Sequence, residues 1–130
     1  MPDTAEPRRA QQILVVEDEP LIRLMAVDML NILGFGVLEA GSGAEALAVA
    51  AEYSYGIDAL MIDLGLPDQR GEDVVRQVAF GRPGLPVIIT SGADASAGRA
   101  LDGFGVVAFL EKPYYFKYLE MSVALLPRSV

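Results

Sequence analysis

The feature that most constrains the fold of this chain is an alternation, repeated five times, of short apolar runs with longer amphipathic stretches. Ile13–Val16 is a continuous apolar run, as expected of a strand that is buried on both faces of a sheet. Similar runs predict four more strands, at residues 35–38, 57–62, 86–90 and 106–110. Strands that alternate with helices indicate a parallel sheet with helices on both faces.

The stretches between the strands carry the start and stop signals of helices. Pro20 suits a first helical turn, and Ser42 with Glu45 forms a capping-box pattern. The expected helices cover residues 20–33, 42–53, 72–80 and 114–126. A further helix is expected between the fourth and fifth strands, where glycines recur at residues 92, 98, 103 and 105. Glycine costs a helix interior roughly 1 kcal/mol relative to alanine, so this helix should be short or mobile.

Right-handed crossovers leave few topologies for such a chain. Among doubly wound sheets, the order 2-1-3-4-5 suits five strand–helix units of this length, and the predicted fold class is therefore α/β, a flavodoxin-like (βα)5 domain with a five-stranded parallel sheet. We expect residues 13–126 to form this single domain, after a flexible segment at 1–12 and before a short tail at 127–130.

Composition excludes several kinds of function. The 130 residues include neither cysteine nor histidine, which rules out thiol catalysis, a Cys- or His-based metal site and a role as a phosphohistidine donor. The net charge of −8 opposes binding to nucleic acid and to anionic membrane surfaces. The chain has no apolar run of membrane-spanning length, and residues 1–12 lack the apolar core of a signal peptide, so a cytoplasmic location is expected.

Polar side chains follow the apolar runs at four separate places. In an open parallel sheet, ligands bind beyond the carboxyl ends of the strands, so these residues are candidates for a common site. They are Glu17, Asp18 and Glu19 after the first strand, Asp63 after the third, Thr90 and Ser91 after the fourth, and Lys112 after the fifth. In the order 2-1-3-4-5 the first and third strands are neighbours, so their carboxylates should converge.

A converged set of this kind is suited to phosphoryl transfer. Crowded carboxylates repel one another unless a cation is present, and oxygen-only ligands favour a hard ion such as Mg²⁺. One carboxylate can then attack phosphorus, while the metal and a lysine balance the charge on the transferring group. Each residue alone has an ordinary explanation as a helix-start, turn or loop residue, but their joint placement at four strand ends favours aspartyl phosphorylation.

These residues resemble the response-regulator receiver domains of two-component signalling, over roughly residues 13–126. The motifs that carry the resemblance are Ile13–Pro20 (ILVVEDEP), Met61–Pro67 (MIDLGLP), Leu85–Gly92 (LPVIITSG) and Glu111–Pro113 (EKP). Each motif alone is weak, whereas the four in this order and spacing are highly specific. The sequence ends soon after its last expected helix, so a stand-alone receiver is expected.

The resemblance implies a role for each matching residue. Asp63 is the expected phosphoacceptor, and Lys112 is the expected phosphate-binding lysine. Asp18, Asp63 itself and the backbone carbonyl of Gly65 are the expected direct ligands of Mg²⁺. Glu17 would hold the metal through water, at a position where the family more often has aspartate.

The resemblance also implies a switch. Phe109 matches the aromatic switch position of the family, and the switch hydroxyl is Ser91 or Thr90, because alternation along a strand lets only one of them face the site. Counting forward from Pro86 by the family's usual spacing leads to Ser91, whereas counting back from Lys112 slightly favours Thr90. We choose Ser91, since a glycine directly after the hydroxyl is a familiar variant.

The function implied by the resemblance is that of a phosphoacceptor, with autodephosphorylation but no turnover of an external substrate. Its donor is a histidine kinase or a histidine phosphotransfer protein, and its output partner is an unknown downstream protein. In receivers the fourth helix, fifth strand and fifth helix report phosphorylation, sometimes through a homodimer. Aromatic residues gather in or near this last strand and helix, at 104, 109, 114, 115, 116 and 118. Most should pack in the core, and the exposed ones should form the partner surface.

Three alternatives are weaker. Phosphatases on a related sheet place a second acid two residues beyond the nucleophile, where this chain has Gly65. A degenerate receiver that only binds partners is disfavoured by the joint presence of Asp18, Asp63 and Lys112. A flavin carrier would need a phosphate loop rich in Ser, Thr and Gly after the first strand, and none follows it.

Overall fold

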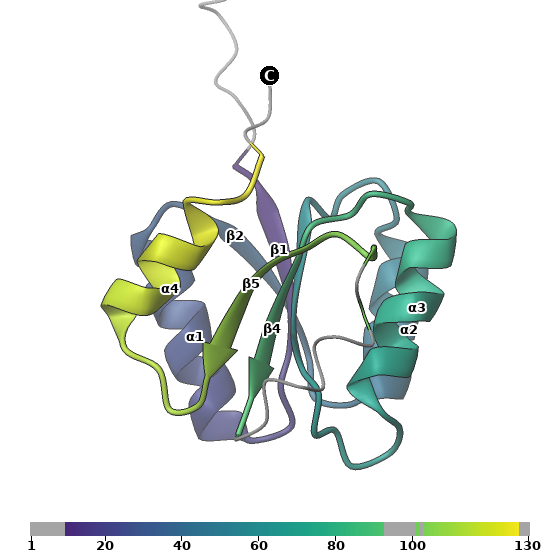
Figure 1. Cartoon of the computed structure of the whole chain (residues 1–130), viewed down its shortest axis with the longest axis horizontal. Helices are drawn as coiled ribbons and strands as arrows, with labels where there is room; N and C mark the ends of the chain where they lie inside the picture. Colours follow the sequence, from purple (N-terminus) through teal and green to yellow (C-terminus); the bar gives the residue numbers. More distant parts are fainter. Residues whose placement is uncertain (1–9, 93–100, 102, 128–130) are drawn as a thin grey trace, which may run out of the picture.

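The computed structural model describes residues 10–92, 101 and 103–127 (Figure 1). This part of the chain contains a five-stranded parallel sheet in the order β2-β1-β3-β4-β5, so the predicted flavodoxin-like fold and strand order are confirmed. The strands are β1 (Gln12–Val16), β2 (Gly36–Ala40), β3 (Ala59–Asp63), β4 (Val87–Ser91) and β5 (Val106–Glu111). The helices are α1 (Pro20–Ile32), α2 (Gly43–Glu52), α3 (Gly71–Gly81) and α4 (Phe116–Val123).

The sheet is covered on both faces, α1 and α4 lying on one side and α2 and α3 on the other (Figure 1). This arrangement explains the continuous apolar run of β1. Leu14 and Val16 pack toward α2 and α3, whereas Ile13 and Val15 pack toward α1 and α4. All four side chains are at most 1% exposed, and burying an aliphatic side chain of this size contributes roughly 1.5–3 kcal/mol.

The end of α1 and the start of α2 follow the sequence signals, with one difference in the capping contacts. At the end of α1, Gly34 adopts a φ of 94°, which a residue with a side chain rarely does. At the start of α2, the Ser42 hydroxyl accepts a hydrogen bond from the Glu45 N–H at 3.1 Å, as a capping box requires. The Glu45 carboxylate, however, accepts from the N–H of Gly41 instead of Ser42. In the part of the chain that the structure describes, no helix is long and apolar enough to cross a membrane.

Some element bounds differ from those expected. β3 begins two residues late, at Ala59, and the Asp58 carboxylate accepts a hydrogen bond from the N–H of Gln12 at 2.7 Å before the ladder starts. The last helix begins only at Phe116, because Tyr115 has extended backbone angles (φ −99°, ψ 161°) and serves as its N-cap. The helix expected between β4 and β5 falls largely on residues that lie outside those described.

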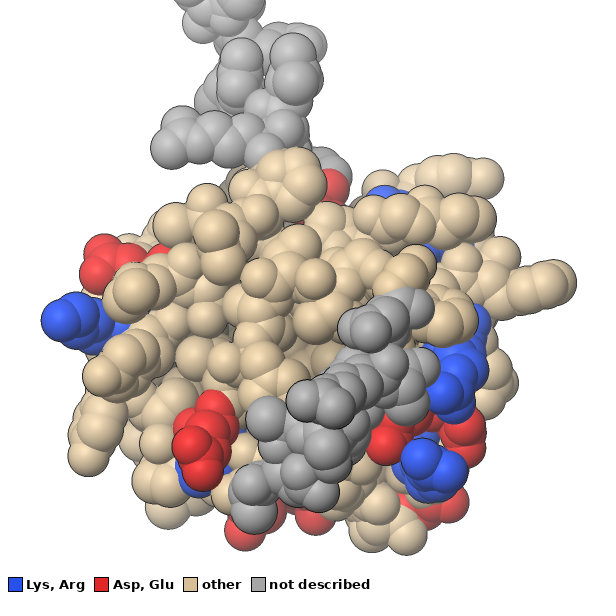
Figure 2. All heavy atoms as spheres, viewed as in Figure 1, with Lys and Arg blue, Asp and Glu red and all other residues tan. Residues whose placement is uncertain are grey.

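The parallel pairing brings the carboxyl ends of the strands to one edge of the sheet. Val16 lies opposite Ile62, Asp63 opposite Thr90, and Ser91 opposite Glu111. The arrowheads of Figure 1 mark this lower edge, and Figure 2 shows several acidic side chains along it. The residues that follow β1 and β3 therefore meet in one place.

Candidate functional site

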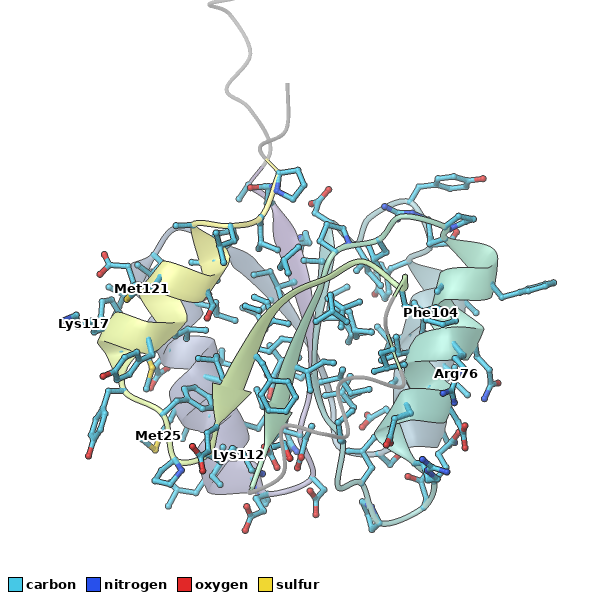
Figure 3. The ribbon with its side chains drawn as sticks, in the orientation of Figure 1. Met25, Arg76, Phe104, Lys112, Lys117 and Met121 are labelled. Carbon is cyan, nitrogen blue, oxygen red and sulfur yellow. The ribbon has the colours of Figure 1, made fainter. Side chains whose placement is uncertain are left out.

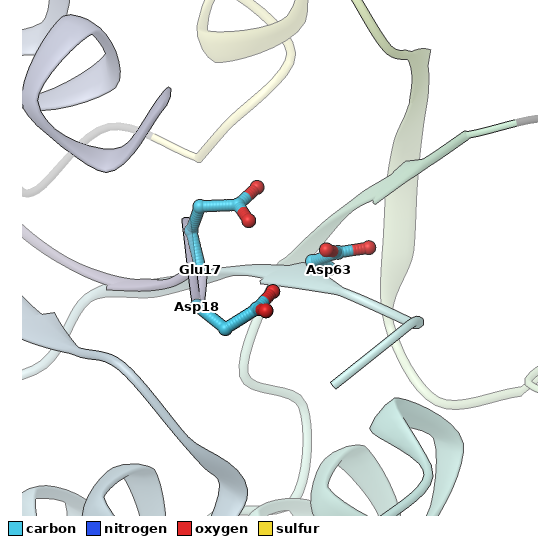
Figure 4. Close-up of side chains that lie close together, drawn as sticks. All are labelled: Glu17, Asp18 and Asp63. Carbon is cyan, nitrogen blue, oxygen red and sulfur yellow. The ribbon is translucent and has the colours of Figure 1, made fainter. Parts of the chain in front are cut away.

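Three carboxylates converge where β1 and β3 end. Glu17 and Asp18 follow the last residue of β1, and Asp63 is the last residue of β3. One carboxylate oxygen of each lies within 4.8 Å of the others, and Figure 4 shows the three side chains close together at the ends of the two strands. Glu17 and Asp63 are each only 4% exposed, whereas Asp18 is half-buried. The structure thus brings together the carboxylates that the strand order predicts to converge.

Lys112 completes this cluster from β5. Its backbone N–H donates to the carbonyl of Ser91 at 2.7 Å, which holds the residue at the end of the sheet. Its ammonium Nζ lies 2.9 Å from Asp63 Oδ2, 3.0 Å from Glu17 Oε1 and 3.8 Å from Glu19 Oε2. The Lys112 side chain is 14% exposed, so these charges meet with little water between them.

Burial and pairing shift the pKa values of this cluster. Burial raises the pKa of Glu17, although hydrogen bonds from the Glu19 N–H and from Lys112 lower it in part. Burial acts to lower the pKa of Lys112, but its hydrogen bonds to Asp63 and Glu17 and their negative charges hold it well above the ordinary lysine value. Burial, together with the charge of Glu17, raises the pKa of Tyr114 to about 12. Lys112 is therefore the charged partner of the acids throughout the physiological pH range.

Backbone N–H groups fix the acidic side chains, and one arginine fixes the backbone of the loop that carries Glu17. The second oxygen of Glu17 accepts from the Glu19 N–H at 3.1 Å, and Asp63 Oδ1 accepts from the Gly65 N–H at 3.0 Å. Arg23 of α1 donates through Nη1 to the carbonyl of Glu17 at 2.7 Å and forms an ion pair with Glu39 of β2 at 3.2 Å. The loop after β1 is therefore tied to both α1 and β2.

The predicted switch residues lie close to this cluster. Thr90 is buried and lies opposite Asp63 in the ladder, while Ser91 is half-buried at the end of β4. Phe109 is half-buried and packs against the core on the α2 and α3 side of the sheet. These positions do not decide which hydroxyl binds the phosphoryl group, and the choice of Ser91 stays a prediction.

Two residues near the site were not singled out for it by sequence. Arg23 reads as a surface residue of α1, and Tyr114 as one of several aromatic residues. Their contacts depend on the chain crossing from one strand to another, which local patterns do not encode. The position of Tyr114, two residues after Lys112, was the one available signal. Figure 3 shows Lys112 close to Met25 of α1, and both line a small cavity with Tyr114.

A doubly wound sheet with a lysine and three carboxylates at its switch point defines a narrow class of α/β domain. The family described as "Response regulator receiver domain" matches residues 13–124. The crystal structure of a response regulator receiver domain protein from Clostridium thermocellum superposes with a TM-score of 0.81 at 30% identity, over 88% of this chain and 91% of that one. The chain therefore belongs to the response-regulator receiver domain family of two-component systems.

Similar proteins of known family support the same assignment. The transcriptional regulatory protein PdtaR of Mycobacterium tuberculosis is 31% identical over 124 residues, which are 95% of this chain and 58% of that protein. The sensor kinase CckA of Brucella abortus is 33% identical over 112 residues, 85% of this chain but 12% of the kinase. The chain thus spans little more than half the length of PdtaR and about an eighth of the length of CckA. Receiver domains are signalling modules that interact with histidine kinases and other proteins.

Proposed function

We propose that this domain is a phosphoacceptor, in which Asp63 takes a phosphoryl group from the phosphohistidine of a histidine kinase or a histidine phosphotransfer protein. The bond from phosphorus to the donor imidazole nitrogen breaks as a bond to a carboxylate oxygen of Asp63 forms. The observation that carries the proposal is a buried carboxylate at the switch point of the sheet, with the Lys112 ammonium 2.9 Å from its Oδ2. The sequence contains no histidine, so the donor imidazole lies outside it.

Lys112 supplies the positive charge that the transferred group requires. Its ammonium donates hydrogen bonds to both Asp63 and Glu17. Once Asp63 carries a phosphoryl group, the ammonium can bind the phosphoryl oxygens with only a small movement. The same side chain thus stabilises the acceptor before transfer and the product after it.

We propose Mg²⁺ as the cofactor, held by Asp18, Asp63 and the backbone carbonyl of Gly65, and through water by Glu17. The donor set fits this ion, because the three carboxylates lie within 4.8 Å of one another and offer oxygen atoms only. Mg²⁺ bound there would offset the charge of the carboxylates and of the transferring phosphoryl group. Asp18 is the most accessible of the three acids, so its carboxylate meets an incoming hydrated ion first.

Ser91 and Phe109 are the residues proposed to sense the phosphoryl group. Ser91 would donate its hydroxyl to a phosphoryl oxygen, and Phe109 would rotate as the end of β4 moves toward the site. Both side chains are half-buried, so a change of rotamer costs less than it would in the closed core. Thr90, which is buried opposite Asp63, is the less favourable choice.

The surface proposed for the output partner lies along β5 and α4. A groove of about 340 Å³ runs there, lined by Phe109, Leu110, Glu111, Pro113, Tyr114, Tyr115 and Tyr118. Tyr115 is 71% and Tyr118 52% exposed, and Figure 3 shows Met121 and Lys117 on the outer side of the same helix. Exposed tyrosines beside a groove are typical of protein interfaces, so we propose that a downstream protein or a second copy of the domain binds here.

Phosphorylation by a small donor tests the proposal. Incubation with acetyl phosphate and Mg²⁺ should raise the intact mass by one phosphoryl group, and Asp63→Asn should abolish the gain. Asp28→Asn is the matched control, because Asp28 lies on the exposed side of α1 and the substitution removes the same charge. An unchanged mass of the wild-type protein, with Mg²⁺ present, would contradict the proposed function.

A further inference from the structure

The loop between β3 and α3 is attached to the start of α2 by one side chain. Asp68 lies in the middle of this loop, and its Oδ1 accepts a hydrogen bond from the Gly43 N–H at 2.8 Å. Its Oδ2 accepts another from the Ala44 N–H at 2.9 Å. These two donors lower the pKa of Asp68, and they belong to the first two residues of α2. The carboxylate is therefore a bidentate cap supplied to one helix by a distant loop.

The backbone N–H groups at the start of α2 donate to two different residues, Ser42 and Asp68. Ser42 accepts hydrogen bonds from two of the later N–H groups: its hydroxyl accepts from the Glu45 N–H and its carbonyl from the Ala46 N–H. The first two N–H groups go to Asp68. Because Asp68 belongs to the loop and the two donors belong to α2, the contact fixes the loop as well as the helix terminus.

Close packing accompanies these hydrogen bonds. Gly43 is buried, and a Cβ atom placed on it would overlap the side chain of Gln69, the residue after Asp68. The absence of a side chain at Gly43 thus lets the loop lie directly on the helix terminus. The loop is held there by two hydrogen bonds and by van der Waals contact.

The same loop carries the groups next to the acceptor. Gly65 donates its N–H to Asp63 Oδ1 at 3.0 Å, and its carbonyl is the proposed backbone ligand of Mg²⁺. At the far end the loop closes on itself, where the Gly71 N–H donates to the carbonyl of Leu64 at 3.1 Å. Asp68 stands between these two ends and joins the loop to a different element.

We propose that Asp68 is a positioning residue for the phosphorylation site: by holding the loop against α2, it fixes where Gly65 lies relative to Asp63. This inference rests on the proposed function, because it concerns the metal and phosphoryl site of that function. Asp68 itself touches neither the metal nor the phosphoryl group. Outer hydrogen bonds that orient metal ligands commonly account for much of a site's affinity.

Mg²⁺ affinity, measured by calorimetric titration of the full chain, tests this role. Asp68→Asn keeps one acceptor oxygen and should raise the Mg²⁺ dissociation constant by about threefold, and Asp68→Ala should raise it by about tenfold, the lower end of such effects. Asp73→Asn is the control, since it removes the same charge from the first turn of α3, where Asp73 pairs with Arg76. It should leave the dissociation constant unchanged.

A second measurement separates positioning from stability. The amide resonance of Gly65 in the metal-free protein should shift in both Asp68 variants and stay in place in Asp73→Asn. A lowered melting temperature with unchanged Mg²⁺ affinity and an unmoved Gly65 amide would overturn the inference, because Asp68 would then only cap α2. If the wild-type protein binds no Mg²⁺, the proposed metal site fails and the inference fails with it.

Discussion

The ammonium of Lys112 lies 2.9 Å from Oδ2 of Asp63, and this contact joins the end of β5 to the end of β3 across β4. The same ammonium is 3.0 Å from Glu17, so a single cation is shared by two carboxylates that are each 4% exposed. Buried charges of this kind are tolerated only when they are paired. The domain therefore depends on Lys112 for its stability, in addition to the role proposed for this residue in phosphoryl transfer.

Replacing Lys112 by methionine should destabilise the metal-free domain. At pH 7.5 the unfolding free energy should fall by about 3–5 kcal/mol, the usual cost of breaking a buried ion pair. Near pH 5 the deficit should shrink, because the unpaired carboxylates can then take up protons at a smaller cost. Urea unfolding at both pH values measures this. Lys117→Met, on the exposed side of α4, is the control, and an equal loss at both pH values would contradict the electrostatic cause.

Neutralising Glu17 should have the opposite effect on stability. Burial raises the pKa of Glu17, so this group favours the folded state at low pH and loses that contribution as pH rises through its raised pKa. Glu17→Gln should therefore be more stable than the wild-type protein at pH 7.5 without metal, because the buried charge is removed. Its Mg²⁺ affinity should fall.

Thermal unfolding with and without Mg²⁺ checks this prediction. Glu19→Gln is the matched control, because Glu19 is mostly exposed and lies farther from Lys112, at 3.8 Å. It should change stability little under either condition. A Glu17→Gln protein that is less stable than the wild type in both conditions would show that the pairing with Lys112 outweighs the burial of the carboxylate.

Removing the switch hydroxyl should uncouple phosphorylation from the output surface. Ser91→Ala should still accept a phosphoryl group on Asp63, but the spectral changes of Phe109 and its neighbours on phosphorylation should be reduced to less than about half. Thr90→Val, which keeps the shape of the buried side chain, should retain them. Two-dimensional NMR spectra recorded with and without phosphodonor would measure both. The reverse result would make Thr90 the switch residue.

A side chain at residue 65 should prolong the phosphorylated state. Neither Gly65, next to the acceptor, nor Gly92, just after β4, has a side chain to keep water from the phosphoryl group, so we expect a short-lived phospho-form. A Cβ atom on Gly65 would lie 3.7 Å from Asp63 Oδ1, an ordinary van der Waals distance, so alanine fits there. Gly65→Ala should lengthen the half-life at least about twofold, which needs only about 0.4 kcal/mol of additional barrier. Gly81→Ala, far from the site on α3, should leave a mass-spectrometric decay curve unchanged.

The fold and the convergence of the carboxylates follow from the sequence because both depend on period and order. A run such as Ile13–Val16 has one structural meaning when it recurs five times with helices between, and the order of parallel strands then brings Asp18 and Asp63 together. The contacts of Asp68 and Arg23 could not be read in the same way. Each depends on how separate elements pack together, Asp68 on α2 and Arg23 on the loop after β1 and on β2, and each uses a residue type that is common on surfaces.

The starts of β3 and α4 were also predicted wrongly, because the backbone just before each element makes other contacts. Ile57 and Tyr114 continue the apolar patterns of β3 and α4. Their backbones, however, lie outside the strand and the helix. Asp58 already binds the start of β1, and Tyr115 is extended to cap the last helix. A hydrophobic pattern indicates which residues are buried. A residue can be buried next to a strand or helix without being part of it, so the pattern does not fix the boundary.

The place of Tyr114 has a practical consequence. Its phenol is half-buried two residues from Lys112 and lies within reach of the charges of Glu17, Lys112 and Asp63. The chain has five tyrosines and no tryptophan, so no stronger fluorophore masks its emission. Any gain of charge at the acceptor changes the electric field on this ring, and with it the near-ultraviolet absorbance and emission. Near-ultraviolet spectra of the unlabelled domain should therefore follow the loading of the acceptor, through the part of the tyrosine signal that comes from Tyr114.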